Sequence, residues 1–581
     1  MTTSAPTSYL APVKVKCHGQ LPHGTCLDCK SILNVGIFFD GTDNNLERDK
    51  PQLSHSNVAR LSDAYRVDPF NGFFSYYIPG VGTKFELVGE MADENAPGSA
   101  FGKGGEARIV CGLLQVLNAM HSFVNDAKRM FEDEQITALT SEHPTPQQNQ
   151  MLREMGLCSG LVGDWMARSR FLARRAGELK MQLEHRDTVP NISGVYLDVF
   201  GFSRGSAQAR VFCNWLHQDL LLPYSGQYGK LCGVPAYVRM LGIFDTVASV
   251  GTSNATGGGD GHRAWASYEN LRIHSDIKNC VHFAALHEFR TVFPLDSVCV
   301  NGKPPPNCSE HVGPGGHSDL GGGYAPGEQG KAIQVVPLNP FYPDEGSKAT
   351  SDDSRKLSQL PLNLMLAAAR KSCENHGVDG VAWLDFKSAA GVTRNLSEQF
   401  ALHNSVPEMV RNYFEKCGVD SNLPLASSLR EHGIRYLSWR YQLATIRNGF
   451  NDLTSVKYAS QTNAISLDYY RRGENIFEMQ LAQKGIWGLW AQPTKLKDGY
   501  QANAQEIMRR LKSAPDTPYG IRQFFDGYVH DSYAGFIEKF EGASLPHDQV
   551  EVEGYLRYRS VYLGDNKRLN ALLETPPQKY A

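Results

Sequence analysis

The sequence of 581 residues lacks the features of a membrane-spanning or disulfide-stapled protein. No run of about 18 uninterrupted apolar residues occurs, so no transmembrane helix is predicted. The N-terminal residues show no basic segment followed by an apolar one, so no cleaved secretory signal is expected. Of the 12 cysteines, those from Cys111 to Cys417 occur singly within apolar or mixed segments. This pattern is typical of free thiols in a reducing cytoplasm.

An excess of charge of one sign is also missing. Lys and Arg together number 58 against 61 Asp and Glu, which gives a net charge of -3. No overall field therefore attracts nucleic acid or anionic lipid, and any such contact must depend on a local patch. The composition, 41% hydrophobic and 20% charged, excludes collagen-like, coiled-coil and disordered classes. The length predicts two domains or one large elaborated domain.

Short apolar runs that end in polar or glycine-rich turns predict the strands of a sheet. They cover residues 33–39, 74–78, 195–200, 240–244 and 281–286. Stretches with helical periodicity, such as 106–131, lie between them. Strands that alternate with helices predict an α/β fold, in which a mostly parallel sheet carries helices on both faces.

The strongest motif is Gly201-Phe-Ser-Arg-Gly205, which follows the apolar run 195–200 and precedes a helical stretch. A strand, a sharp turn and a helix in this order form the nucleophile elbow of α/β-hydrolases. Glycines at 201 and 205 let the backbone turn without a Cβ clash, so the Ser203 hydroxyl is presented above the sheet. Ser203 is the predicted nucleophile, and an ordinary glycine-rich turn is the alternative.

A serine hydroxyl needs a histidine to accept its proton and a carboxylate to orient that histidine. His317, in a glycine-dense loop downstream of Ser203, is the candidate base, and a histidine that caps this turn is the alternative. Asp245 ends an apolar run between them and is the candidate acid, in the chain order Ser, acid, His. Glu288, at the end of the next run, competes with Asp245. Asp319 is predicted to shape the loop of His317.

The oxyanion of a tetrahedral intermediate requires two backbone N–H donors. The residue after the nucleophile, Arg204, is predicted to supply the first. The turn Asp40-Gly-Thr-Asp-Asn-Asn45 is predicted to supply the second from Gly41 or Thr42, because Gly41 allows close approach and Asp40 can fix the loop. The alternatives are a plain tight turn or a calcium loop, although the segment does not match an EF-hand.

Five segments in this order resemble the signatures of the type VI secretion lipase effectors of the first class. They are Gly36-Ile-Phe-Phe-Asp-Gly-Thr-Asp-Asn44, Tyr77-Ile-Pro-Gly-Val-Gly-Thr83, Gly201-Phe-Ser-Arg-Gly-Ser206, Phe244-Asp-Thr-Val-Ala-Ser-Val-Gly251 and Gly316-His-Ser-Asp-Leu-Gly-Gly-Gly-Tyr324. The resemblance covers residues 33 to 330, with a weaker echo at Tyr528-Val-His-Asp-Ser-Tyr533. In one departure, His287 stands where the family tends to have an acidic residue, which favours Asp245 as the acid.

The resemblance implies an antibacterial toxin of α/β-hydrolase fold, a phospholipase A that cleaves membrane glycerophospholipids through a Ser-His-Asp triad and an acyl-enzyme. It implies a spike protein (VgrG) as carrier and a cognate immunity protein as partners, with no nucleic acid. Such an effector is made in the cytoplasm and delivered by the type VI system into the periplasm of the target cell. The chemistry requires no cofactor, while an effect of calcium is left open. A non-lipid serine esterase or peptidase and a non-catalytic spike-associated protein are the alternatives.

The chain is predicted to divide into three parts, namely an N-terminal arm at 1–30, a catalytic domain at 31–355 and a mainly helical lobe at 356–581. An insert at about 132–190 interrupts the catalytic domain. The arm is a predicted docking segment for the carrier. Its residues Cys17, His23, Cys26 and Cys29 have the chemistry of a zinc set, but incidental thiols are favoured because no second C-x2-C pair follows.

Two stretches have aromatic and basic residues together, which suits either a membrane interface or a packed core. The insert contains Trp165 followed by several arginines, and we consider it as a lid over Ser203, with core packing as the alternative. In the lobe, Tyr436 and Trp439 lie at helical spacing, and core packing is favoured there. The pair Trp487 and Trp490 is a second candidate for contact with membrane.

Overall fold

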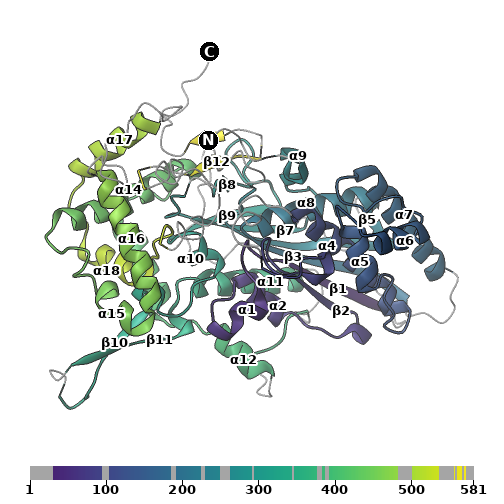
Figure 1. Cartoon of the computed structure of the whole chain (residues 1–581), viewed down its shortest axis with the longest axis horizontal. Coiled ribbons are helices and arrows are strands. Elements are labelled where there is room, and N and C mark those ends of the chain that lie inside the picture. The colour runs from purple at the N-terminus through teal and green to yellow at the C-terminus, as the bar shows by residue number, and fades with distance from the viewer. Residues whose placement is uncertain are drawn as a thin grey trace.

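The computed structural model describes most of the chain from Lys30 to Asn570. The described residues are 30–93, 104–184, 191–223, 229–248, 262, 264–290, 293–342, 346–375, 382–386, 392–481, 500–534, 555–556, 559–564 and 568–570. The predicted zinc set and docking arm, and the pair Trp487 and Trp490, lie outside these residues. Figure 1 shows a central sheet with the C-terminal helices on one side and the helices of the insert at the opposite end.

Six parallel strands form the centre of the sheet in the order β2-β1-β3-β6-β7-β9. Their bounds are Phe73–Ile78 for β2, Lys30–Phe39 for β1, Asn191–Phe202 for β3, Val234–Phe244 for β6, Asn279–Ala285 for β7 and Cys308–Gly313 for β9. The short strands β5 (Gly229–Leu231) and β4 (Leu222–Pro223) extend it in antiparallel fashion beside β6. The five predicted strands are confirmed, and β9 is an addition.

Two layers of helices bury both faces of this sheet, which confirms the α/β-hydrolase type of fold. Helices α4 (Gly105–Val124) and α8 (Arg204–Asp219) share one core with the strands. Helices α2 (Asn57–Ala64) and α11 (Gln359–Asn375) share a second core with the opposite face. Strand β1 contributes to both cores, which explains its nearly continuous apolar sequence.

The strand order reverses between β1 and β3, because the chain passes from β1 to β2 on one side and later to β3 on the other. In open α/β sheets, ligands bind at the carboxyl ends of the strands beside such a switch point. The turn that begins with Asp40 and the turn that contains Ser203 follow β1 and β3. The fold therefore brings these two turns together.

Among the described residues, one helix, α4, is long and apolar enough to span a membrane by length and composition alone, and 89% of its most apolar 18-residue stretch is buried inside the fold. It packs against the sheet and against α8, on the same face of the sheet, as a core helix. The described cysteines, Cys111 through Cys417, are all free, and all except the exposed Cys158 are buried, as the sequence predicted.

The prediction of a lid in the insert is wrong. The insert forms α5 (Asp133–Thr140), α6 (Pro146–Glu154) and α7 (Trp165–Glu184). Near the start of α7, the buried Arg168 donates to Asp219 at 2.9 Å, and its guanidinium lies 3.6 Å above the Trp215 ring. Asp219 ends α8, about 24 Å along the helix axis from Ser203. Trp165 is therefore held far from the elbow.

The C-terminal lobe is helical, as predicted, and packs on the second face of the sheet. Its further helices are α12 (Val392–Gln399), α13 (Ser405–Lys416), α14 (Leu425–Thr445), α15 (Thr454–Thr462), α16 (Ala464–Leu481), α17 (Tyr500–Ser513) and α18 (Tyr519–Tyr528). Tyr436 and Trp439 are buried in the core that the lobe shares with the sheet, so core packing is confirmed for both. The lobe and the sheet thus form one continuous hydrophobic unit.

Several small elements complete the structure. They are α1 (Leu46–Asp49), α9 (Tyr268–Leu271), α10 (His317–Gly321), the hairpin β10 (Ile333–Pro337) and β11 (Ser347–Ser351), and the strands β8 (Leu295–Asp296), β12 (Ser560–Tyr562) and β13 (Arg568–Asn570). Strand β12 pairs with β8 in parallel and with β13 in antiparallel fashion. In Figure 1, β12 lies beside β8 although the two are far apart in the sequence. The C-terminal segment therefore returns to the catalytic domain.

Candidate active site

Ser203 lies in the sharp turn between β3 and α8. Its backbone has φ 57° and ψ -125°, a region that residues with a Cβ rarely adopt. A Cβ on Gly201 would lie 2.5 Å from the Gly205 carbonyl oxygen, and a Cβ on Gly205 would lie 2.2 Å from the Phe39 carbonyl oxygen. The Ser203 amide donates to the Phe244 carbonyl at 3.0 Å, which ties the turn to β6. These features are the backbone geometry expected of a nucleophile elbow.

His317 is the first residue of α10, just beyond β9. Its Nδ1 lies 2.6 Å from Oδ2 of Asp245. The rings of Phe202 and Phe293 lie 4.6 and 4.9 Å from the imidazole, measured between ring centroids. Burial lowers the pKa of His317, although the hydrogen bond to Asp245 acts in the opposite direction. The imidazole is therefore held in one orientation in a largely apolar pocket.

Two buried polar atoms at this place have no hydrogen-bond partner among the described residues, namely Oγ of Ser203 and Nε2 of His317. Buried polar atoms are rarely left unpaired in a folded protein unless a ligand or a reaction uses them. Phe202, which precedes Ser203, packs against the His317 ring. The side chains of Ser203 and His317 therefore belong to one pocket. The pocket thus offers an unpaired hydroxyl and an unpaired imidazole nitrogen.

Asp245 follows β6, has no exposed surface and accepts a hydrogen bond from the Ala285 amide at 2.8 Å. Arg559 donates to both of its carboxylate oxygens, at 2.6 and 2.8 Å. Burial alone would raise the pKa of Asp245, but the Arg559 guanidinium and the His317 hydrogen bond lower it well below its usual range. An ionised carboxylate only accepts hydrogen bonds, so Nδ1 of His317 carries the proton and Nε2 carries the lone pair.

Glu288, the competing acid, lies beside the histidine without contacting its ring. Its carboxylate accepts hydrogen bonds from Arg290 and from the Ser532 hydroxyl. It also accepts a bond from the backbone amide of His317 at 3.2 Å. The structure therefore places Asp245, and not Glu288, on the imidazole, while Glu288 fixes the backbone at the start of α10.

His287, where the sequence departs from the family pattern, also acts on the loop before α10. Its Nδ1 accepts a hydrogen bond from the Gly315 amide at 2.9 Å. Its Nε2 lies 3.0 Å from the Tyr413 hydroxyl, and burial lowers the pKa of His287 well below its usual value. A neutral histidine thus connects the loop of His317 to α13 of the lobe.

In the turn after β1, the amides of Gly41 and Thr42 differ in whether they have an acceptor among the described residues. The Gly41 amide donates to Oδ1 of Asp40 at 2.7 Å and is therefore engaged. The Thr42 amide donates to no group among the described residues, and its buried hydroxyl is also unpartnered there. Asp40 also accepts from the Ser56 and Tyr77 hydroxyls at 2.5 Å each, and burial raises the pKa of Asp40 to about 6. Asp40 fixes the turn as expected, and the free donor is Thr42 and not Gly41.

Arg204 opens α8 directly after Ser203. The first amides of a helix have no acceptor within the helix, and the Arg204 amide has none in the described part of the chain. The partial positive charge of the helix N-terminus favours an anion at this point. The Arg204 and Thr42 amides, from the turns after β3 and β1, are thus two donors without an acceptor in the described part of the chain.

Asp319 has more partners than the sequence predicted. Its Oδ2 accepts from the Gly316 amide at 2.9 Å, which shapes the loop as expected. Its Oδ1 lies 2.6 Å from Nδ1 of His530, whose ring stacks on Tyr324 at 3.8 Å. This contact was not predicted, and the weak echo at residues 528–533 is the sequence signal that could have pointed to it. Arg559, by contrast, lies in no motif.

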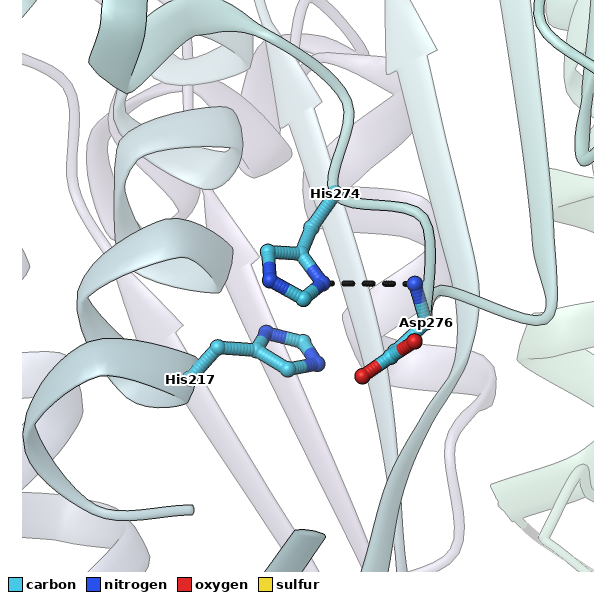
Figure 2. Close-up of side chains that lie close together, drawn as sticks. All are labelled: His217, His274 and Asp276. Atoms are coloured by element: carbon cyan, nitrogen blue, oxygen red, sulfur yellow. Dashed lines mark hydrogen bonds between the residues drawn. The ribbon is translucent and has the colours of Figure 1, made fainter. Parts of the chain in front are cut away.

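A group of possible metal ligands lies elsewhere on the catalytic domain, where His217, His274 and Asp276 have ligand atoms within 4.8 Å of one another (Figure 2). The two rings stack at 3.9 Å with an interplanar angle of 15°. An imidazole binds a metal in the plane of its ring, so one ion cannot bind both stacked rings unless a ring turns. His217 lies near the end of α8, about 21 Å along the helix from Ser203. The group therefore takes no part in the pocket of Ser203.

Comparison with known proteins identifies the family. A family model described as "T6SS, Phospholipase effector Tle1-like, catalytic domain" matches residues 34–231 and 224–368, more than half of the chain. The chain belongs to this family of type VI secretion phospholipase effectors. Its catalytic domain is accordingly that of a lipolytic hydrolase, and the matched residues include Ser203, Asp245 and His317.

Comparison with solved structures gives two matches of different quality. An uncharacterized protein from Pseudomonas aeruginosa has 24% sequence identity and a TM-score of 0.69, with 93% of this chain and 80% of that chain covered. This likeness shows a shared fold. The Tle1 effector bound to the VgrG spike of the type VI secretion system has 16% identity and a TM-score of 0.32, over 70% of this chain and 84% of that one. No curated protein matches the chain.

Proposed function

We propose that the effector is a serine phospholipase A that hydrolyses carboxylic esters of membrane glycerophospholipids. The observation that carries this proposal is the pocket in which Ser203 Oγ and His317 Nε2 are both buried, with no partner in the part of the chain that the structure describes, while His317 Nδ1 contacts Asp245. In a family of phospholipase effectors, such an arrangement supports nucleophilic catalysis by the serine.

The first half of the reaction forms an acyl-enzyme. Ser203 Oγ attacks the acyl carbonyl carbon, and its proton passes to Nε2 of His317. The Arg204 and Thr42 amides donate to the oxyanion of the tetrahedral intermediate. When the intermediate collapses, the bond from the carbonyl carbon to the glycerol oxygen breaks, and Nε2 returns the proton to that oxygen. The lysophospholipid then leaves.

The second half of the reaction releases the fatty acid. A water molecule attacks the acyl carbonyl carbon and gives a proton to Nε2 of His317. When the new intermediate collapses, the bond from the carbonyl carbon to Ser203 Oγ breaks and the fatty acid leaves. Oγ takes the proton back from Nε2. Asp245 keeps Nδ1 protonated throughout and stabilises the imidazolium in both halves. These steps use only groups of the chain, so we propose that no metal ion or other cofactor is required.

The partners and the place of action follow from the family and remain part of the proposal. A VgrG spike protein is the proposed carrier, and the arm at residues 1–30 is the proposed docking segment. A cognate immunity protein would protect the producing cell. The phospholipids of the target cell, reached from its periplasm, are the proposed substrate.

Product analysis tests this function. Purified effector is incubated with diacyl phospholipid vesicles in which the sn-1 and sn-2 chains differ, and the products are measured by mass spectrometry. We expect one free fatty acid and the matching lysophospholipid, with and without EDTA, and neither from the Ser203→Ala variant. Hydrolysis only of soluble esters would favour a non-lipid esterase. No hydrolysis of any ester would favour a non-catalytic role.

A further inference from the structure

Arg559 is a buried cation bound directly to the carboxylate of the proposed triad. Its two terminal nitrogens donate to the two oxygens of Asp245, and Nη2 also donates to the Ala285 carbonyl at 2.8 Å. Bidentate pairs of this kind are among the strongest hydrogen-bonded contacts in proteins. Oδ2 of Asp245 is thereby shared between Arg559 and His317, each at 2.6 Å. The positive charge of Arg559 thus offsets the negative charge of the ionised Asp245 carboxylate even while His317 is neutral.

The segment that carries Arg559 is built into the catalytic domain. It leads directly into β12, which pairs with β8 through Val561 opposite Leu295 and Tyr562 opposite Asp296. The ring of Tyr562 packs edge-on against His262, and His262 bonds to Asp296 at 2.6 Å. Arg559 itself is only 2% exposed. A segment near the C-terminus therefore holds the carboxylate of Asp245.

We infer that Arg559 is a positioning residue of the active site, which fixes Asp245 for His317 and limits how strongly Asp245 attracts the proton onto the imidazole. This inference rests on the proposed triad. A positive charge on the acid has two opposed effects. It orders the carboxylate, which favours a productive geometry for His317. It also offsets the negative charge that stabilises the imidazolium, so His317 releases its proton more readily.

Apart from Asp245, the charged groups that face His317 have partners other than Arg559. The effect of Arg559 on His317 can therefore be measured separately from theirs. Asp245 contacts the ring from β6, and Glu288 contacts the backbone amide of His317. Arg290 is paired with Glu288, and Asp319 in α10 is paired with His530. Arg559 is the one cation on Asp245 among the described residues. Its removal therefore changes the charge on Asp245 and leaves these other pairs in place.

The test compares Arg559→Met and Arg559→Lys with a control variant, Arg239→Met. Arg239 is also fully buried and bidentate on a carboxylate, that of Asp198, but it touches no group of the triad. The pH dependence of kcat/KM is measured for each protein with a soluble p-nitrophenyl ester. The midpoint of thermal unfolding is measured in parallel.

For Arg559→Met we expect the acid limb of kcat/KM to move to higher pH by about one unit, because His317 then binds its proton more tightly. We also expect the plateau to fall about tenfold, because Asp245 loses two hydrogen bonds. Arg559→Lys keeps the charge, so its plateau should fall while its acid limb stays at the wild-type pH. Arg239→Met should lower the unfolding midpoint and leave the acid limb in place.

An acid limb that stays at the wild-type pH in Arg559→Met, with a lower plateau, would show that Arg559 is merely structural. If Arg559→Met does not fold, Arg559→Lys decides the matter, since an acid limb that moves in this charge-conserving variant would overturn the inference. The proposed function fails separately, because in that case the wild-type protein releases no fatty acid from phospholipid vesicles, whatever the variants do with the soluble ester.

Discussion

Two of the buried histidine–carboxylate pairs in the described part of the chain join Nδ1 of a histidine to an aspartate, and only one of these two shares a pocket with Ser203, the proposed nucleophile. In the pair that we propose to be catalytic, called the catalytic pair below, Nδ1 of His317 is 2.6 Å from Asp245. In the other pair, called the loop pair, Nδ1 of His530 is 2.6 Å from Asp319. In both pairs, Nε2 is buried without a partner among the described residues. The pair alone is therefore no sign of catalysis.

The surroundings of the two pairs differ. The catalytic pair shares its pocket with Ser203, and its acid carries the cation Arg559. In the loop pair, the acid accepts backbone amides of its own loop and of His530, and Tyr324 covers the imidazole. The loop pair connects α10 to the end of α18. The hydrogen bond between histidine and carboxylate therefore does not identify a catalytic dyad by itself. Two other features distinguish the proposed one, namely a serine hydroxyl in the same pocket as Nε2 and a cation bound to the carboxylate.

The largest expected difference between the two pairs is in the loss of kcat when each aspartate is replaced by asparagine. We expect Asp245→Asn to lower kcat by about 10⁴-fold, because the amide no longer holds His317 in the tautomer with a lone pair on Nε2. Asp319→Asn should lower kcat by no more than about tenfold, the value of one buried hydrogen bond. Equal losses in the two variants, measured on one ester substrate, would mean that the two pairs act together.

The pH dependence of kcat/KM in the wild-type protein tests whether His317 is the base. His317 must be neutral to accept a proton, and burial lowers its pKa below the ordinary value of 6.5. We expect kcat/KM to stay constant as pH falls to 6.5 and to drop about tenfold per pH unit only below the lowered pKa. An acid limb above pH 6.5 would contradict the environment described for His317.

A smaller effect is expected at Glu288, which contacts the backbone of His317 but not its ring. In Glu288→Gln the side chain keeps one acceptor oxygen for the His317 amide and loses the ion pair with Arg290. We expect kcat to fall about tenfold or less, with the pH profile otherwise unchanged. A loss as large as that of Asp245→Asn would mean that Glu288 is the acid of the triad.

Much of the sheet and the elbow could be predicted from the sequence because their signals are local. Apolar runs that end in turns identified β1, β2, β3, β6 and β7. Strand β9 was missed because it contains Glu310 and His311, polar residues that do not resemble a buried strand. Inside the fold, Glu310 pairs with His282 of the neighbouring strand at 2.7 Å, so its charge is compensated across the sheet.

Long-range contacts account for the rest of what could not be predicted. The sequence could not exclude a lid formed by Trp165 and the arginines of the insert, because the contact of Arg168 with Asp219 at the far end of α8 forms only in the folded chain. Thr42 could not be separated from Gly41, because the bond from Gly41 to Asp40 depends on the folded turn. Arg559 follows the triad histidine by more than 200 residues and carries no local signal.

The central claim, that Ser203 is a nucleophile activated by the catalytic pair, is tested most directly with a fluorophosphonate probe. The full-length protein is labelled and digested, and the modified peptide is found by mass spectrometry. We predict a single adduct on Ser203 that is absent in Ser203→Ala, much slower to form in Asp245→Asn and retained in Asp319→Asn. A protein that is folded and hydrolyses phospholipid but carries no adduct on Ser203 would contradict the claim.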